Sequence, residues 1–371
     1  MAIRDVEFSS LGLFVGQVDS FVTSQTPANI KGVTNLQTIN VSTDIPLEDV
    51  GVAGRTATTK INNEAPTVSI DLTYYSVDLY NESILGFTVD STASCLSRIL
   101  TRDTDQRNYF IPITDEGIDL ENASAADYQV LAIGNGYISS YSTEGSVGSF
   151  VQSTIGIQGS NVSAHADGVS EANPAVDSDG YASAGTFTLP SGLATISGQT
   201  SVIGQGDIVL EVTRNPENAL FYNPTGLCLQ GYNISFDLGS ATRQCLGSKF
   251  PNSRKPTFPI SVDFSIDALG GDLSTGALAT QLCNDGSKNI DLAVSLHTPN
   301  CETTRGPVLA RYELKNAVFQ GFSSNASQGD DQGQTVTMNY QGSISASGDT
   351  VNGLFFSGAY DYSAGTPVFS S

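Results

Sequence analysis

The stretch LQGYNISFDL, residues 229–238, repeats a stretch near the start of the chain, LQTINVSTDI, residues 36–45. Leu, Gln, Asn, Ser and Asp occupy the same places in both stretches, at an offset of 193 residues. Apolar and polar residues alternate in each, which is the pattern of a half-buried β-strand. A duplicated chain should give further matches of this kind, in the same order along the sequence.

Three further blocks recur in that order. They are VSIDLT (68–73) with ISVDFS (260–265) at an offset of 192, IGNGYISSYS (133–142) with LKNAVFQGFS (314–323) at 181, and TIGIQGS (154–160) with TMNYQGS (337–343) at 183. The early block VGQVDSFV (15–22) has no clear counterpart. Four collinear blocks favour an internal duplication over chance similarity between β-strands.

The strand patterns predict an all-β protein made of two tandem β-sandwich or barrel domains, with one short helix in each repeat. We expect domain 1 over residues 1–165, a Gly/Ser/Asp-rich linker over 166–195 and domain 2 over 196–371. The helices are expected at 91–100 and in the same slot of the second repeat, at 274–283, each with a serine as its N-cap.

Two segments between matched strands are unusually long, at 46–66 and 239–259. Both exceed the ordinary length of a hairpin loop, and long loops are often functional. The first carries acids and bases, whereas the second carries bases only. Solvated surface charge is one interpretation, and docking onto another subunit is the other. The residues proposed for docking are Glu48, Asp49, Arg55, Lys60, Glu64, Arg243, Lys249, Arg254 and Lys255.

The net charge of −22 argues against nucleic-acid binding, because binding to phosphates requires Lys and Arg to displace counterions. The same charge keeps a surface soluble, and it suits a channel through which DNA passes without adhering. We expect no signal peptide, because Arg4, Asp5 and Glu7 leave no apolar core region near the start, and no membrane partner, because no run of 18 apolar residues occurs.

Patterns for catalysis or metal binding are weak throughout. The two histidines, His165 and His297, lack metal-ligand spacing, and the sequence has no GxSxG and no P-loop. The five cysteines include no CxxC pair, so reduced thiols are expected, with a Cys283–Cys301 pair as the alternative. We therefore expect no enzyme activity, no catalytic residues, no metal and no cofactor.

The segment GYISSYSTEGSVGSFVQSTIGIQGSNV, residues 136–162, resembles the closing hairpin of bacteriophage tail tube proteins. The strand VSIDLTY (68–74) after a long loop is similar to that family as well. The duplication resembles the siphophage variant, in which a major tail tube protein carries two tube domains and forms trimeric rings. The resemblance extends over most of the chain as a pattern of strands and turns.

The resemblance implies a structural protein of the virion tail, made in the host cytoplasm. Its partners would be copies of itself, in trimeric, pseudo-hexameric rings stacked into a tube, and the long loops would contact the next ring. DNA would pass through an acidic lumen without specific binding during ejection. Tail terminator, tape-measure and tip proteins are the further partners implied. The alternatives are a non-polymerising tail-tip or head–tail connector protein, and a β-rich surface adhesin.

Overall fold

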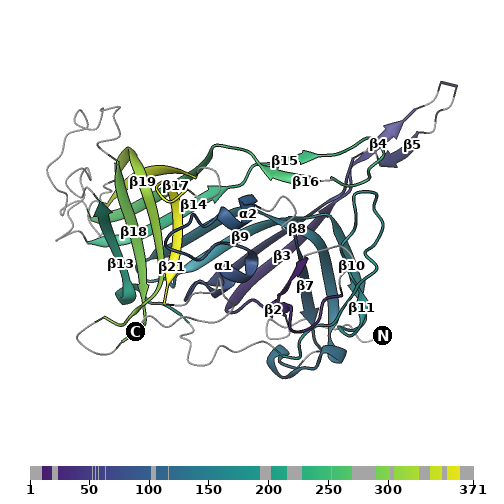
Figure 1. The fold of residues 1–371 in the computed structure, drawn as a ribbon, viewed down its shortest axis with the longest axis horizontal. Helices are drawn as coiled ribbons and strands as arrows, with labels where there is room; N and C mark the ends of the chain where they lie inside the picture. The colour runs from purple at the N-terminus through teal and green to yellow at the C-terminus, as the bar shows by residue number, and fades with distance from the viewer. Residues whose placement is uncertain are drawn as a thin grey trace.

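Nearly all of the regular structure of this chain is β-strand (Figure 1). The computed structural model describes residues 11–18, 24–51, 53–54, 56, 58–62, 64–101, 106–115, 117–192, 202–214, 228–251, 253–269, 289–300, 305–325, 335–344 and 349–359. The strands of the first half are β1 (Phe14–Val18), β2 (Ile30–Gly32), β3 (Leu36–Asp44), β4 (Leu47–Val50), β5 (Thr59–Asn62), β6 (Thr67–Tyr75), β7 (Gln106–Ile113), β8 (Gln129–Ser146), β9 (Gln152–Gly159), β10 (Asn161–His165), β11 (Glu171–Ala172) and β12 (Thr186–Phe187). Those of the second half are β13 (Ile208–Arg214), β14 (Leu229–Asp237), β15 (Ser240–Arg243), β16 (Ser253–Pro256), β17 (Ile260–Leu269), β18 (Ile290–His297), β19 (Val308–Asn325), β20 (Thr335–Ile344) and β21 (Gly353–Gly358). The helices are α1 (Tyr80–Leu85) and α2 (Ser97–Thr101), and no helix among the described residues is long and apolar enough to cross a membrane.

Eight strands form what we call the central sheet, in the antiparallel order β3-β6-β9-β8-β14-β17-β20-β19. The first four belong to one half of the chain and the last four to the other. Each half also has a flanking sheet, β2-β1-β7-β8-β10 in the first and β13-β18-β19-β21 in the second. The fold is therefore all-β, as predicted, and the strand pairings of these sheets in the first half recur in the described part of the second, except for that of β1 with β2.

The two longest strands, β8 and β19, pass from a flanking sheet into the central sheet at an asparagine. Asn135 and Asn316 both adopt a left-handed backbone, with φ of 58° and 59°. The backbone N–H of Asn135 donates to Asn108 Oδ1 at 3.3 Å, and that of Asn316 donates to Asp291 Oδ1 at 2.7 Å. Asparagine is one of the few residues that adopt this conformation readily, which explains its retention as the third residue of the repeated block.

We expect Asn316→Ala to be less stable than Asn316→Gly by about 1–2 kcal/mol, which is the cost of a left-handed backbone for a residue with a Cβ atom. Both variants lose the side-chain bonds from Asn289 (2.8 Å) and to Asn352 (2.6 Å), so their difference isolates the backbone strain. Midpoints of denaturant unfolding would measure it. A glycine variant no more stable than the alanine variant would contradict the account.

Irregularities of the ladders recur at matching places. β3 has a bulge between Leu36 and Thr38, and β14 has one at the position 193 residues later. The pairing also corrects one alignment made from the sequence. Val68 pairs with Gly159, and Val262 pairs with Gly342, the counterpart of Gly159. β6 and β17 therefore correspond at an offset of 194. The value of 192 was two residues off, a shift that leaves the buried face unchanged because strands have period two.

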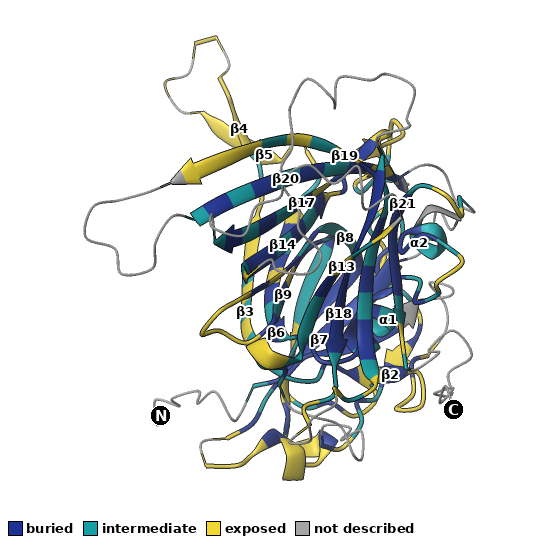
Figure 2. Ribbon diagram, turned by 90° about the vertical axis from the view of Figure 1, so that its left-hand side faces the viewer, coloured by how far each residue is buried: buried dark blue, intermediate teal, exposed yellow. Residues whose placement is uncertain are grey.

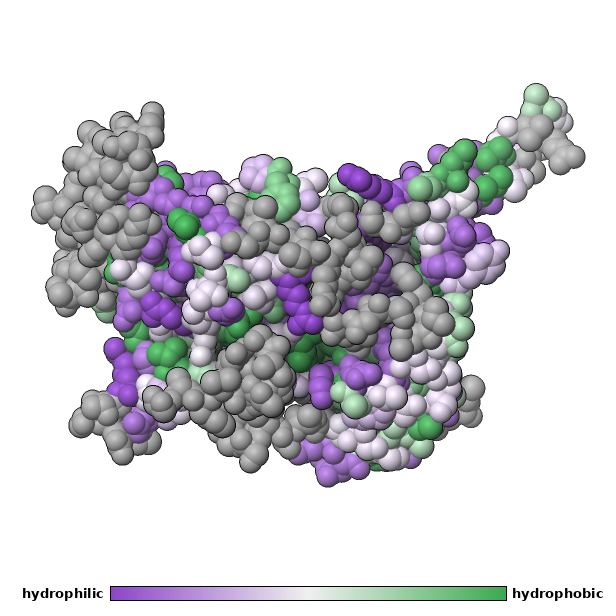
Figure 3. All heavy atoms as spheres, in the orientation of Figure 1, coloured by the Kyte–Doolittle hydropathy of each residue, from purple (hydrophilic) through white to green (hydrophobic). Residues whose placement is uncertain are grey.

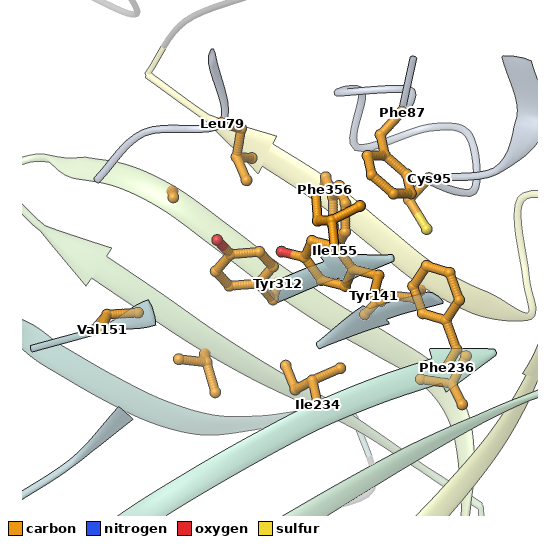
Figure 4. Close-up of a cluster of buried hydrophobic side chains, with 14 of the residues drawn as sticks. Leu79, Phe87, Cys95, Tyr141, Val151, Ile155, Ile234, Phe236, Tyr312 and Phe356 are labelled. Atoms are coloured by element: carbon orange, nitrogen blue, oxygen red, sulfur yellow. The ribbon is translucent and has the colours of Figure 1, made fainter. Parts of the chain in front are cut away.

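The two halves share a hydrophobic core. Tyr141 stacks on Phe236 of the second half with ring centroids 5.5 Å apart, and Phe87 contacts Phe356 edge-on at 5.7 Å. Tyr312, also from the second half, meets Phe356 at 5.3 Å (Figure 4). Aromatic pairs of this kind contribute about 0.5–1.5 kcal/mol each beyond their buried area. The large hydrophobic cluster that contains these residues is therefore built by both halves.

The segment predicted as a linker lies on the first half as far as residue 192. Phe187 of β12 packs against Phe110 with ring centroids 4.5 Å apart, and both belong to a second hydrophobic cluster. The backbone N–H of Gln25 donates to the carbonyl of Thr186 at 2.7 Å. β12 therefore joins the first half, and the domain boundaries remain a prediction.

The helix expected at 91–100 is shorter, because α2 covers Ser97–Thr101. Its first residues form a turn instead, in which the N–H of Thr92 donates to Asp90 Oδ1 at 2.8 Å. An aspartate that bonds the backbone two residues on favours a turn over a helix. The helical slot at 274–283 lies outside the described residues.

Candidate functional site

The central sheet has one apolar and one polar face. Its strands bury alternate residues, as β6 does with Val68, Ile70, Leu72 and Tyr74. The opposite row is rich in Ser, Thr, Asn and Gln, and we call it the polar face. Its carboxylates are Asp44, Asp71, Glu144, Asp237, Asp263 and Asp267. The strand segments that form the central sheet contain no Lys or Arg.

Neutral groups donate hydrogen bonds to two of the carboxylates of the polar face. Gln341 Nε2 donates to Asp263 Oδ1 at 2.9 Å, and Thr337 Oγ1 donates to Asp267 Oδ1 at 2.5 Å. None of the six carboxylates forms an ion pair with another described residue. The polar face therefore carries uncompensated negative charge within the described residues and repels polyanions.

The edge strand β3 is less buried than its counterpart β14. Among the described strands, β3 pairs with β6 alone, whereas β14 pairs with β17 and β8. The core-facing residues of β14 and of the position after it are all buried: Tyr232, Ile234, Phe236 and Leu238. Their counterparts are half-buried or exposed: Ile39, Val41, Thr43 and Ile45. The contrast is largest at the end, where Leu238 is 4% exposed and Ile45 58%.

The two segments expected to be long loops are hairpin arms (Figure 1). The first arm is β4–β5, with Asp49 opposite Lys60. The second arm is β15–β16, with Thr242 opposite Arg254. The second arm lies along the first half of the chain, and the first arm extends away from both halves (Figure 1).

A buried arginine seats the second arm on the first half. Arg254 is only 5% exposed, and its Nη1 donates to the carbonyl of Gln158 at 3.0 Å. Its Nη2 reaches the carbonyl of Gly159 and the hydroxyl of Ser160, both at 3.5 Å. The guanidinium carbon also lies 5.4 Å from the ring centre of Tyr137, as in a cation–π contact. Burial lowers the pKa of Arg254.

A second contact fixes the tip of the same arm. The backbone N–H groups of Lys249 and Phe250 donate to the carbonyl of Ser178 at 2.9 and 3.0 Å. The Lys249 ammonium lies 5.9 Å from the ring centre of Tyr181. Reversal of Arg254 to a glutamate would place a carboxylate beside the carbonyl oxygens of the seat. Such a variant would disturb the fold of the chain and is therefore a poor probe of docking between chains.

The first arm is exposed on all sides (Figure 2). Hydrophobic residues gather along it (Figure 3): Ile45, Leu47, Val50 and Ile61 are each 41–58% exposed. Lys60 Nζ lies 3.8 Å from Asp49 Oδ1, and both side chains are more than half exposed. An exposed ion pair of this kind contributes little to stability. A projecting arm with apolar side chains is typical of a surface that another molecule covers.

The residues predicted to dock lie on both arms. Glu48, Asp49, Lys60, Glu64, Arg243 and Lys249 are exposed, and Arg254 is buried in its seat. Arg55 and the side chain of Lys255 lie outside the described residues. Docking onto another chain remains a prediction for these residues.

A buried carboxyl group between the two halves was missed in the sequence. Glu82, on α1, is fully buried, and its Oε1 accepts bonds from the hydroxyls of Tyr74 (2.7 Å) and Tyr141 (3.2 Å). Burial raises the pKa of Glu82 to about 7, against the lowering effect of the Tyr74 bond. The nearby Glu82 charge and, above all, burial raise the pKa of Tyr312 in the second half. A glutamate is rarely buried, and the helix that carries it was not predicted.

His165 links strands of the first half. Its Nδ1 lies 2.8 Å from Glu171 Oε2 and its Nε2 2.9 Å from Ser163 Oγ, an order of groups also found in hydrolases. The ring packs edge-on against Phe187 at 5.2 Å and so ties β10 to β11 and β12. We assign it a structural role. No three His, Cys, Asp or Glu side chains among the described residues form a metal-binding group.

No family model and no curated protein sequence matches this chain. Among solved structures, a chain in the cryo-EM structure of the anti-feeding prophage (AFP) baseplate is similar at a TM-score of 0.31, with 10% identity over 44% of this chain and 97% of that one. The SPP1 tail tube is similar at a TM-score of 0.29, with 13% identity over 43% of this chain and 79% of that one. At these TM-scores the likeness does not bear on function.

Proposed function

We propose that this chain is a structural protein of a bacteriophage tail, whose copies close into rings and stack into a tube. One observation carries the proposal. The central sheet repeats one order of four strands, and its end strands, β3 and β19, correspond to β14 and β8, the pair that joins the two halves. An end strand that repeats a joined strand can form the same junction with a neighbouring copy.

The junction inside the chain is the pattern that we propose for the junction between chains. Ile234 of β14 pairs with Thr143 of β8, so a repeat of this junction at the offsets of 193 and 181 would bring Val41 of one copy opposite Ser324 of the next. This pairing would cover the core-facing row of β3, including Ile45. On β19, Val318 and Phe322 are 51% and 48% exposed, and the same junction would cover that strand.

The polar face supports a tube as well as a ring. In a closed ring the central sheets form a barrel with the shared core outside, so the polar face lines the lumen. Its six carboxylates would repel the DNA backbone and allow it to slide. From the family resemblance we take three chains, and so six tube positions, for each ring. The resemblance also suggests the tail terminator, tape-measure and tip proteins as neighbours in the virion.

Negative-stain electron microscopy of the purified chain, with its mass in solution, tests the proposal. Hollow tubes, or rings with three times the mass of one chain, are the expected result. Single rings that never stack would favour a connector or tip protein. A chain that stays monomeric at high concentration would overturn assembly altogether.

A further inference from the structure

We propose that Lys60 of the first arm docks on the Gln341–Ser343 segment of a neighbouring copy in the same ring, as Arg254 docks on Gln158–Ser160 within the chain. The inference rests on the ring assembly proposed above. It assigns the first arm a lateral partner in its own ring and specifies the surface that it meets.

Lys60 and Arg254 occupy the same position in the two arms. Lys60 is opposite Asp49 in the first arm, and Arg254 is opposite Thr242 in the second. Thr242 follows Asp49 by 193 residues, which is the offset between β3 and β14. Arg254 follows Lys60 by 194 residues, which is the offset between β6 and β17. Both arms therefore present a cation at the same place on their second strand.

The seat of Arg254 also has a counterpart. It consists of Gln158, Gly159 and Ser160, and the same three residue types recur 183 residues later as Gln341–Ser343. The strand registers agree, because Gly159 pairs with Val68 of β6 and Gly342 pairs with the counterpart of Val68 on β17, Val262. The Gln-Gly-Ser motif of the first half thus holds an arm, and no arm from the described part of the same chain docks on the motif of the second half.

Exposure distinguishes the occupied seat from the open one. Ser160, under the second arm, is 7% exposed, whereas Ser343 is exposed. Tyr137, which faces the Arg254 guanidinium, is half-buried, whereas its counterpart Val318 is 51% exposed. The open seat therefore offers carbonyl and hydroxyl oxygens beside an apolar side chain.

The chemistry of lysine suits that seat. An ammonium group donates up to three hydrogen bonds and needs acceptors only, which two carbonyls and one hydroxyl supply. The aliphatic stem of Lys60 would cover Val318, as long cationic side chains often do on apolar surface. The exposed ion pair with Asp49 does not hold Lys60 in place, since it is weak and open to solvent.

Photo-crosslinking of assembled protein tests the contact directly. A benzophenone amino acid replaces Lys60, and chains labelled with ¹⁵N are mixed with unlabelled chains before assembly. We expect mixed-isotope crosslinks between the arm and the peptide that contains Gln341–Ser343. The same probe at Thr59, which points to the opposite face of the arm, should give at least fivefold fewer of these crosslinks.

The outcomes separate this inference from the proposed function. Rings or tubes in which position 60 crosslinks to other segments only would overturn the docking of Lys60 and leave the assembly intact. A chain that forms no assemblies would overturn the proposed function and this inference with it. As a second measurement, Lys60→Glu should raise the concentration needed for assembly about tenfold, which is the effect of about 1.4 kcal/mol. Lys31→Glu makes the same change of charge at an exposed position of β2 and should not.

Discussion

Between about pH 4 and pH 8, the free energy of unfolding of a Glu82→Gln variant is expected to rise by about 3 kcal/mol relative to that of the wild-type chain. The carboxyl group is fully buried between the two halves, and burial raises its pKa from 4.5 to about 7. The native state therefore keeps a proton that the unfolded state releases. Glutamine is neutral at every pH and retains an oxygen for the hydroxyls of Tyr74 and Tyr141.

The direction follows from proton binding. Below about pH 4.5 both states of the wild-type chain hold the proton, and stability does not depend on this group. As the pH rises toward 7, the unfolded state loses the proton first, so the wild-type chain loses stability until its native state also ionises. The wild type should thus be most stable in acid with respect to this group, and the variant should lack that dependence.

Denaturant unfolding of unassembled protein at several pH values measures the effect. The amide of the variant lies where Glu82 Oε2 has no hydrogen-bond partner among the described residues. Any effect of the amide on the free energy of unfolding is the same at every pH, so the comparison across pH removes it. Glu121→Gln makes the same change at an exposed position and should show no such pH dependence. A constant difference between Glu82→Gln and wild type at all pH values would show that folding does not shift the pKa of Glu82.

Reversing Asp71, Glu144 and Asp263 to lysine is expected to turn assembled protein into a binder of DNA. The three residues lie on the polar face, and the strand segments of the central sheet contain no Lys or Arg. The reversals change the net charge from −22 to −16, but the new cations are concentrated on one surface. Retention of DNA by sedimented tubes should rise at least about tenfold at low salt and fall steeply as salt is added, since the cations displace counterions from phosphate.

A matched variant separates the surface from the total charge. Asp119, Glu121 and Asp179 are exposed residues outside the central sheet, and their reversal to lysine gives the same net charge. Its tubes should retain little DNA internally, and any DNA bound outside should remain open to nuclease. Equal, nuclease-sensitive retention by both variants would contradict a lumen lined by the polar face.

The sequence predicted the strands of the first half well, because their signal is local. Alternation of apolar and polar residues predicted β3, β6 and β9 as strands, and Gly, Asn, Asp and Pro marked the ends. The sequence showed that an asparagine is repeated at positions 135 and 316. Only the structure shows that both asparagines adopt a left-handed backbone conformation, which explains the repetition. β1 pairs with β7, and β13 pairs with β18, the counterpart of β7, but the sequences of β1 and β13 share no pattern that a comparison of letters detects.

The remaining features depend on contacts between distant residues. Arg254 looks like one of several bases in a polar loop, and only the seat formed by residues 158–160 shows that it is buried. Glu82 lies in a stretch of ordinary surface composition, and its burial follows from the meeting of the two halves around α1. The strands of the two hairpin arms were missed for another reason. The segments 46–66 and 239–259 contain no obvious short turn, so both were predicted as long loops.

The junction of β8 with β14 also bears on the kinetics of assembly. Because both strands belong to one chain, this contact forms as the chain folds and does not weaken on dilution. In a ring of six tube positions every second contact would be of this kind, so that only half of the contacts require two molecules to meet. Each chain would then contribute a preassembled third of the ring, and the rate of ring closure would depend on a single type of encounter between chains.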